Sequence, residues 1–540
     1  MPFIGEQLLP GQIGNFLAIL SFVASLLATI AYFKATQSQI PTVQQSWKRI
    51  ARVSFLAEII SVIGIFVALY FIISNHRFEY KYAWQHSNYQ LPMQYILACF
   101  WEGQEGSFLL WSFWHCVLGG IIILREKKWE APVMTTISFM QFALATMVIG
   151  IYFFDFKIGS NPFVLMRDQG MLSPEQFPIG FDSEGHLRSD YLSFIRDGNG
   201  LNPLLQNYWM TIHPPVLFLG FASTLIPFAF AIAGLWKKDY GGWVLPARPW
   251  ALFSAGILGL GIMMGAAWAY ESLTFGGYWA WDPVENASLV PWLVLVAGIH
   301  TQVIYNATGH SLRATKVFFI LGFCLVLYST FLTRSGVLGD SSVHAFTGLG
   351  MDAQLLIFLL IFLVPAFALF FKRFKEIPHI VKEEETSSRE FWMFIGALVL
   401  FLSAAIITWQ TSFNPIYNKI TGQSTAAPED IEFSYNKIQV FVAIVIALLT
   451  AITQYLKYKK TASQLWVKKI LIPTSIAAAI TLIFFLVSGL EYDKKGIGFQ
   501  AALYLAFFAS VYSVVANASY IWIGLNGRLK AAGASVAHVG

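Results

Sequence analysis

The sequence predicts an all-α fold, a polytopic transmembrane helix bundle of about 13-14 spans with the N-terminus outside. The 540-residue chain is 56% hydrophobic and only 12% charged, whereas a soluble domain of this size carries far more charge. Runs of roughly 18 to 25 apolar residues, enough to cross about 30 Å of hydrocarbon, recur almost from end to end. Lys and Arg gather in alternate connections between these runs. The bilayer is therefore the expected solvent.

The apolar runs locate the spans. The first run lacks a basic segment and a cleavage site before it, so we expect a retained span and not a signal peptide. A last apolar segment begins near residue 531 and stops with the chain, which predicts a truncated form with a fourteenth span cut off. The thirteen complete spans are expected near residues 12-33, 50-74, 105-124, 132-154, 213-236, 249-269, 288-306, 315-333, 353-371, 391-409, 437-456, 469-490 and 499-525.

Charge fixes the expected orientation. The segments REKKWE after Leu124, KRFKEIPHIVKEEE after Phe371 and KYKKTASQLWVKK after Leu456 are strongly basic, and positive loops stay in the cytoplasm. The opposite connections hold nearly every unusual residue, so the chemistry is expected at the outer face. They comprise residues 75-104, 155-212, 270-287, 334-352, 410-436 and 491-498.

Three segment groups follow: an N-terminal transmembrane group with outer loops at 1-212, a central core at 213-352, and a C-terminal transmembrane group at 353-540. Cys99, Cys116 and Cys324 lie far apart and form no CxxC pair, which excludes a disulfide framework, a structural zinc site and a haem-attachment site. The net charge of +5 comes without a basic, aromatic-rich helix, so membrane lipid is an expected neighbour and nucleic acid is not.

A tryptophan-rich outer loop, FGGYWAWDPVENASLVPW, occupies residues 275-292 of the core. One interpretation is an interfacial turn in which Asp282 caps a short helix and the rings anchor the segment. The other is a flat apolar surface for a planar ligand, haem above all, which indoles can stack on and glycines can approach closely. The residues expected to contact such a ligand are Gly276, Gly277, Tyr278, Trp279, Trp281, Asp282, Pro283, Glu285 and Trp292.

This loop resembles the tryptophan-rich WWD signature of haem-handling membrane proteins. Its VENASLVPW stretch is similar to the CcmF family, the haem lyase subunit of cytochrome c maturation. The resemblance extends to WEGQEGSFLLW at 101-111, NPLLQNYWMTIHPPVLFLG at 202-220 and TFLTRSGVLGDSSVHAF at 330-346. Two departures stand out: Ala280 follows Tyr278-Trp279 where an aromatic is common, and the family's C-terminal outer domain and last span are missing, which leaves partner contacts open.

Two outer-face histidines flank the loop in sequence. His213 precedes Pro214 and Pro215, so it is expected at the outer start of a helix. His344 lies about ten residues beyond a span. For each alone, ordinary interfacial hydrogen bonds are an open alternative, but the resemblance implies that both are axial ligands of a substrate haem. Arg334 either pairs with a haem propionate or marks the end of its span.

Two further histidines are expected within the membrane. Counting 1.5 Å per residue places His300 and His538 level to within about a turn, so they could clamp one iron from opposite faces. The resemblance implies the same pair as ligands of a bis-histidine haem b. His115 has no partner at its depth and is expected to be hydrogen-bonded core.

Other polar residues of the outer face have weaker interpretations. His76, His86 and His186 are expected at the surface. Glu102, Gln104 and Glu105 form either a polar plug, with a quinol and proton route, or a helix cap.

The resemblance implies a cytochrome c haem lyase (synthase) component in a bacterial plasma (inner) membrane with a periplasmic active face. It would promote thioether attachment of haem to apocytochrome c, with the buried haem as reductant and no protein acid or base. The implied partners are a haem chaperone at the outer face, apocytochrome c with its thiol-handling subunit, and quinol. The alternatives are a single-subunit synthase, a haem or ion transporter without synthetic activity, and a structural assembly subunit.

Overall fold

The computed structural model describes residues 3–540 apart from 155, 170, 273–276, 339–349, 382–383, 424, 426–427, 462, 490–491 and 493–494. Within these residues, 13 helices are long and apolar enough to cross a membrane, and each overlaps one of the thirteen complete spans predicted from the sequence. The named strands in the same residues are a single short antiparallel pair. The prediction of an all-α transmembrane bundle is therefore confirmed.

The chain forms two compact units. Unit 1 comprises Met1–Trp279 and Gly348–Pro365, and unit 2 comprises Ala280–Thr347 and Ala366–Gly540. The groups 1-212, 213-352 and 353-540 remain a prediction about sequence organisation. Each unit has its own set of packed helices and is described separately.

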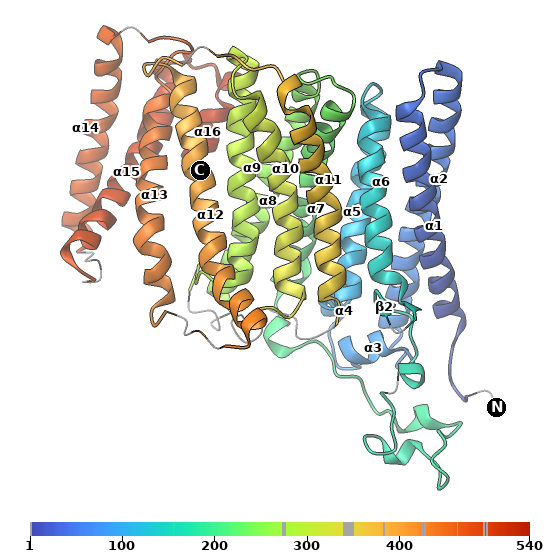
Figure 1. Cartoon of the computed structure of the whole chain (residues 1–540). Coiled ribbons are helices and arrows are strands. Elements are labelled where there is room, and N and C mark those ends of the chain that lie inside the picture. The colour runs from blue at the N-terminus through green and yellow to red at the C-terminus, as the bar shows by residue number, and fades with distance from the viewer. Residues whose placement is uncertain are drawn as a thin grey trace. The chain divides into compact units, whose positions relative to one another are not determined.

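In unit 1, α1 packs against α2 and α6, α5 packs against α2, α6 and α7, and α7 packs against α8. The N-terminus, α3 and the β2 end of α6 lie at the same end of these helices (Figure 1). The elements are α1 (Leu9–Gln37), α2 (Pro41–Ser74), α3 (Lys81–His86), α4 (Met93–Glu102), α5 (Gln104–Arg125), α6 (Glu130–Ile149), β1 (Ile151–Phe153), β2 (Phe156–Ile158), α7 (Tyr208–Trp236), α8 (Val244–Glu271) and the first part of α11 (Asp352–Arg373).

In unit 2, α9 packs against α10 and α12, α13 packs against α12 and α15, and α15 also contacts α14 and the short helix α16. Figure 1 shows α12 and α13 side by side. The elements are α9 (Pro283–Thr308), α10 (Leu312–Arg334), α12 (Arg389–Thr421), α13 (Ile431–Thr453), α14 (Ser463–Ser488), α15 (Ile497–Ile523) and α16 (Gly533–Val539).

Helix α6 ends earlier than its apolar run. The predicted span continued to residue 154, but Gly150 adopts a left-handed conformation with φ of 62° directly after Ile149. Such a residue closes a helix because it turns the backbone away from the helical path. The apolar residues that follow form β1 instead, so hydrophobicity alone misplaced this boundary.

Candidate functional site

The two acidic residues of the tryptophan-rich segment cap the N-terminus of helix α9. The Asp282 carboxylate accepts a hydrogen bond from Val284 N at 2.8 Å, and Glu285 Oε2 accepts one from Asp282 N at 3.1 Å. This reciprocal pair is a capping box, with Pro283 in the first helical position. The segment 275–292 is thus not a loop throughout, because its residues from Pro283 onward are helical.

Trp281 is fixed by three contacts within unit 2. Its backbone has φ of 56°, and its indole stacks on Tyr435 of α13 with ring centroids 5.0 Å apart and planes 6° apart. The indole N–H donates to Asn436 Oδ1 at 2.9 Å, and Asn286 Nδ2 donates to the Trp281 carbonyl at 2.9 Å. These contacts within the protein hold Trp281 in one orientation.

The other residues of the segment differ in exposure. Tyr278 is 46% exposed, while Trp279 and Trp292 are half-buried. Gly277 has φ of 150°, which favours glycine, and a Cβ there would meet no atom within 4 Å. Gly276 lies outside the described residues. A role for this segment in haem contact stays a prediction.

His213 lies inside helix α7, not at its start. The helix begins at Tyr208 because the Asn207 side chain caps it, accepting from Trp209 N at 3.0 Å. The expected start at His213 was therefore wrong: Pro214 and Pro215 are accommodated inside the helix.

The WEGQEGS segment supplies a hydrogen bond that Pro214 removes from α7. Proline leaves the carbonyl four residues earlier without its helical donor, and the indole N–H of Trp101 donates to that carbonyl, Met210 O, at 2.8 Å. The His213 ring meets Trp268 of α8 edge-on at 5.8 Å, and a Cβ on Gly265 would lie 3.0 Å from it. His344 lies outside the described residues, so the pairing of these two histidines stays a prediction.

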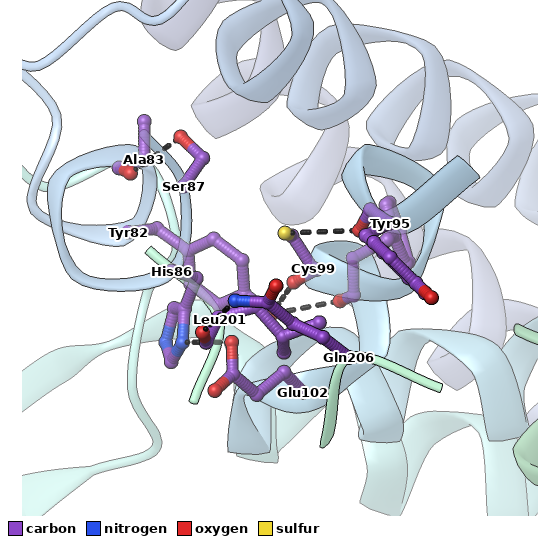
Figure 2. Close-up of polar contacts among 10 residues, drawn as sticks. Tyr82, Ala83, His86, Ser87, Tyr95, Cys99, Glu102, Leu201 and Gln206 are labelled. Atoms are coloured by element: carbon purple, nitrogen blue, oxygen red, sulfur yellow. Dashed lines mark hydrogen bonds and ion pairs between the residues drawn. The ribbon is translucent and has the colours of Figure 1, made fainter. Parts of the chain in front are cut away.

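The WEGQEGS segment forms the junction between α4 and α5. Figure 2 shows Tyr82, His86 and Glu102 drawn toward one another at this junction. His86 Nδ1 lies 3.1 Å from Glu102 Oε2, and the Tyr82 hydroxyl donates to Phe100 O at 2.7 Å. Burial, reinforced by the nearby Glu105 and Glu102, raises the pKa of Tyr82 well above its usual value, so the phenol stays a neutral donor.

Neither acidic residue of this segment caps α5. Glu102 pairs with His86, and the Ser160 hydroxyl donates to Glu105 Oε1. Gln104 is buried against Met351, also in unit 1. The segment is thus a polar junction that is hydrogen-bonded to His86 of α3 and to Ser160 beyond β2. His86, expected at the surface, is only 19% exposed in its side chain and has an acidic partner.

His300 and His538 lie together within unit 2. Their imidazole ring centroids are 6.2 Å apart and their planes differ by 8°. His300 Nδ1 lies 2.8 Å from Val296 O, one turn earlier on α9. A carbonyl can only accept, so Nδ1 carries the proton and Nε2 keeps its lone pair. The side chain of Gln454 lies 2.9 Å from His538 Nδ1.

The remaining predicted positions have structural interpretations. His115 is fully buried, with Nε2 3.2 Å from Ala222 O, as expected for hydrogen-bonded core. Arg334 is the last residue of α10, and its pairing with a propionate stays a prediction. Sequence reasoning missed Gln454, Trp101 and the partner of His86, because each acts on a residue far along the chain or across a break between helices.

Comparisons with known proteins agree with one another. Residues 101–338 match the family described as Cytochrome C assembly protein. The cytochrome c-type biogenesis protein CcmF of Pseudomonas aeruginosa is 30% identical over 458 residues, which cover 82% of this chain and 63% of that protein. The protein of the same name from Escherichia coli K12 is 28% identical over 543 residues, covering 98% of this chain and 76% of the other.

A solved structure titled Cytochrome c Heme Lyase CcmF has the same fold, with a TM-score of 0.69 at 21% identity. The match covers 100% of this chain and 76% of that one. The chain spans slightly less than two thirds of the length of the first relatives that it matches.

Proposed function

Because the chain belongs to the CcmF family of cytochrome c-type biogenesis proteins, we propose that it is a haem lyase component that promotes covalent attachment of haem to apocytochrome c. The site would be the periplasmic face of a bacterial inner membrane. The observation that carries the proposal beyond family membership is the pair of neighbouring, nearly parallel imidazoles, His300 and His538.

This pair fits a bis-histidine haem b. Two imidazole nitrogens each about 2 Å from one metal ion put the ring centres roughly 6 Å apart, close to the 6.2 Å between these rings. The Val296 carbonyl fixes the His300 tautomer that leaves Nε2 as the ligand atom. Such a haem supplies one-electron transfer when bound.

The protein residues then have simple tasks. His300 and His538 would hold the iron inside unit 2, while the polar partners of their Nδ1 atoms keep both rings oriented. We propose that a haem held by these two histidines would serve as the reductant that keeps the iron of the substrate haem ferrous. In the attachment step each cysteine S–H of the apocytochrome adds across a vinyl C=C, forming one C–S and one C–H bond with no leaving group. This needs orientation more than a protein acid or base.

At the outer face, His213 and His344 would be the axial ligands of the substrate haem, with the 275–292 segment against its plane and Arg334 near a propionate. His213 is supported by its setting, a half-buried ring beside Gly265 and Trp268. A haem chaperone would deliver the haem, a thiol-handling subunit would present the apocytochrome, and quinol would supply electrons.

Replacing His213 by Ala should lower covalent haem in c-type cytochromes by about tenfold or more, since losing an iron ligand costs more than the roughly 1.4 kcal/mol of one factor of ten. The measurement is peroxidase staining of haem on denaturing gels, in a strain whose own copy is deleted. His186→Ala is the matched control, because His186 is 75% exposed on a unit 1 loop. Wild-type staining with His213→Ala would remove His213 from the proposal.

Gln454→Leu should leave a b-type haem bound but raise its midpoint potential. When Nε2 of His538 binds iron, Nδ1 carries a proton. The Gln454 carboxamide would then turn its oxygen toward Nδ1 to accept that hydrogen bond. Without that acceptor, the His538 imidazole donates less electron density to the iron. Ferric iron is then less stabilised, so the midpoint potential rises. Redox titration of the haem bands measures the shift.

The control for that titration is Gln439→Leu on α13, the helix that ends just before Gln454; the Gln439 side chain instead accepts from Ser403 Oγ at 2.6 Å. It should leave the potential at its wild-type value. Equal potentials for the wild type and Gln454→Leu would mean that Gln454 does not orient an iron ligand.

A further inference from the structure

Unit 1 has a carboxyl group near the middle of a membrane span, remote in sequence from every residue assigned to haem. Glu58 lies halfway along the 34-residue helix α2 and is 1% exposed. The hydroxyl of Ser21 on α1 donates to its Oε1 at 3.1 Å. Among the described residues, no Lys, Arg or His forms a salt bridge with it, and Oε2 has no hydrogen-bond partner.

A second carboxyl group of the same unit provides the contrast. The Glu130 side chain is also fully buried, but Lys48 Nζ lies 2.7 Å from Oε2 and Arg52 donates to both oxygens at 2.7 and 2.8 Å. Two cations therefore balance its charge. An ionised Glu58 would be stabilised only by the Ser21 hydroxyl group, which leaves its charge without a cation in an apolar interior.

The neighbouring helices contribute further polar atoms that lack partners. Gln141 of α6 donates to Ser112 O at 3.1 Å and Cys116 Sγ at 2.9 Å, both on α5, which packs against α2. Yet Gln141 Oε1 and Ser138 Oγ, one turn apart on α6, have no hydrogen-bond partner in the described part of the chain. Both side chains are fully buried. Buried polar atoms of this kind are commonly satisfied by water.

We propose that Glu58 is an intramembrane proton-binding site, a neutral carboxylic acid that exchanges its proton with water held by the polar groups of α5 and α6. The donor set suits a proton better than a metal ion, because no group of three or more His, Cys, Asp or Glu with metal-binding geometry occurs among the described residues. A protonated Glu58 holds one proton in the membrane without net charge. The site is independent of the haem proposal, since its residues belong to unit 1 and the buried histidines belong to unit 2.

The test is infrared spectroscopy of the purified full chain in H₂O and D₂O, comparing the wild type with Glu58→Gln. Glutamine has nearly the same shape but cannot ionise. We expect the variant to lose the carbonyl stretch of one protonated carboxyl group, and this band to shift in D₂O in the wild type. The control is Glu184→Gln, because Glu184 is 79% exposed; it should lose carboxylate bands only.

Loss of carboxylate bands from Glu58→Gln would mean that Glu58 is ionised, and a carbonyl band unmoved by D₂O would exclude proton exchange; either result overturns the proposal. Should Glu58→Gln not fold, Ser21→Ala replaces it. Removing the hydroxyl donor should shift the same carbonyl band, and an unshifted spectrum would contradict the assignment. None of these readouts depends on bound haem, so they succeed or fail separately from the lyase proposal.

Discussion

Gly106→Ala is expected to prevent stable folding of the junction between α4 and α5. A Cβ at this position would lie 1.5 Å from Phe100 O and 2.5 Å from the Tyr82 hydroxyl oxygen. The first of these atoms belongs to the backbone, so no side-chain rotation relieves the overlap. The junction would have to open, breaking the hydrogen bond between Tyr82 and Phe100. We expect little protein in isolated membranes by immunoblotting, and a lowered melting temperature for any that is recovered.

Gly120→Ala is the control, because it lies on the same helix and a Cβ there would meet no atom within 4 Å. This variant should reach wild-type amounts, since alanine favours a helix more than glycine does. Normal amounts and stability of Gly106→Ala would show that the close approach at the junction is not needed for the fold.

Arg52→Leu should lower the free energy of unfolding by about 2 kcal/mol, because among the described residues it leaves the buried Glu130 carboxylate paired with Lys48 alone. The effect is below that for a fully buried pair, since the Arg52 side chain is 48% exposed and water screens part of its charge. Denaturant unfolding in detergent micelles measures the difference.

Lys128→Ala provides the comparison for Arg52→Leu. The Lys128 side chain is 74% exposed and pairs with Asp239 at 2.9 Å, so its loss should cost under about 1 kcal/mol. Equal costs for the two variants would contradict the view that burial of Glu130 gives its ion pairs their larger effect.

The spans could be predicted from the sequence because bilayer thickness fixes the length of an apolar run. Their ends could not, because caps decide them. Asn207 starts α7 before His213, Asp282 starts α9 inside the tryptophan-rich segment, and Gly150 stops α6 while the apolar residues continue. Each boundary depends on one polar or glycine residue that a hydropathy pattern passes over.

The similar depth of His300 and His538 was expected from the sequence, since a helix rises regularly and depth can be counted, but their pairing was expected only from the family resemblance. Gln454 could not be found in this way, because its role depends on which helix lies beside α16. The stacking of Trp281 on Tyr435 joins residues far apart in the chain, and the contact of His86 with Glu102 depends on the break at Gly103. Depth is a property of one helix, whereas lateral neighbours are a property of the whole bundle.

The most direct measurement is the visible absorption spectrum of the detergent-purified chain, oxidised and reduced, for the wild type, His300→Ala and His310→Ala. His310 lies just beyond the end of α9 and pairs with Glu384 at 3.5 Å, so it serves as the control. We predict a low-spin b-type spectrum in the wild type and His310→Ala that is lost or strongly weakened in His300→Ala. A colourless wild-type protein, or a haem spectrum unchanged by His300→Ala, would contradict haem ligation by His300 and His538.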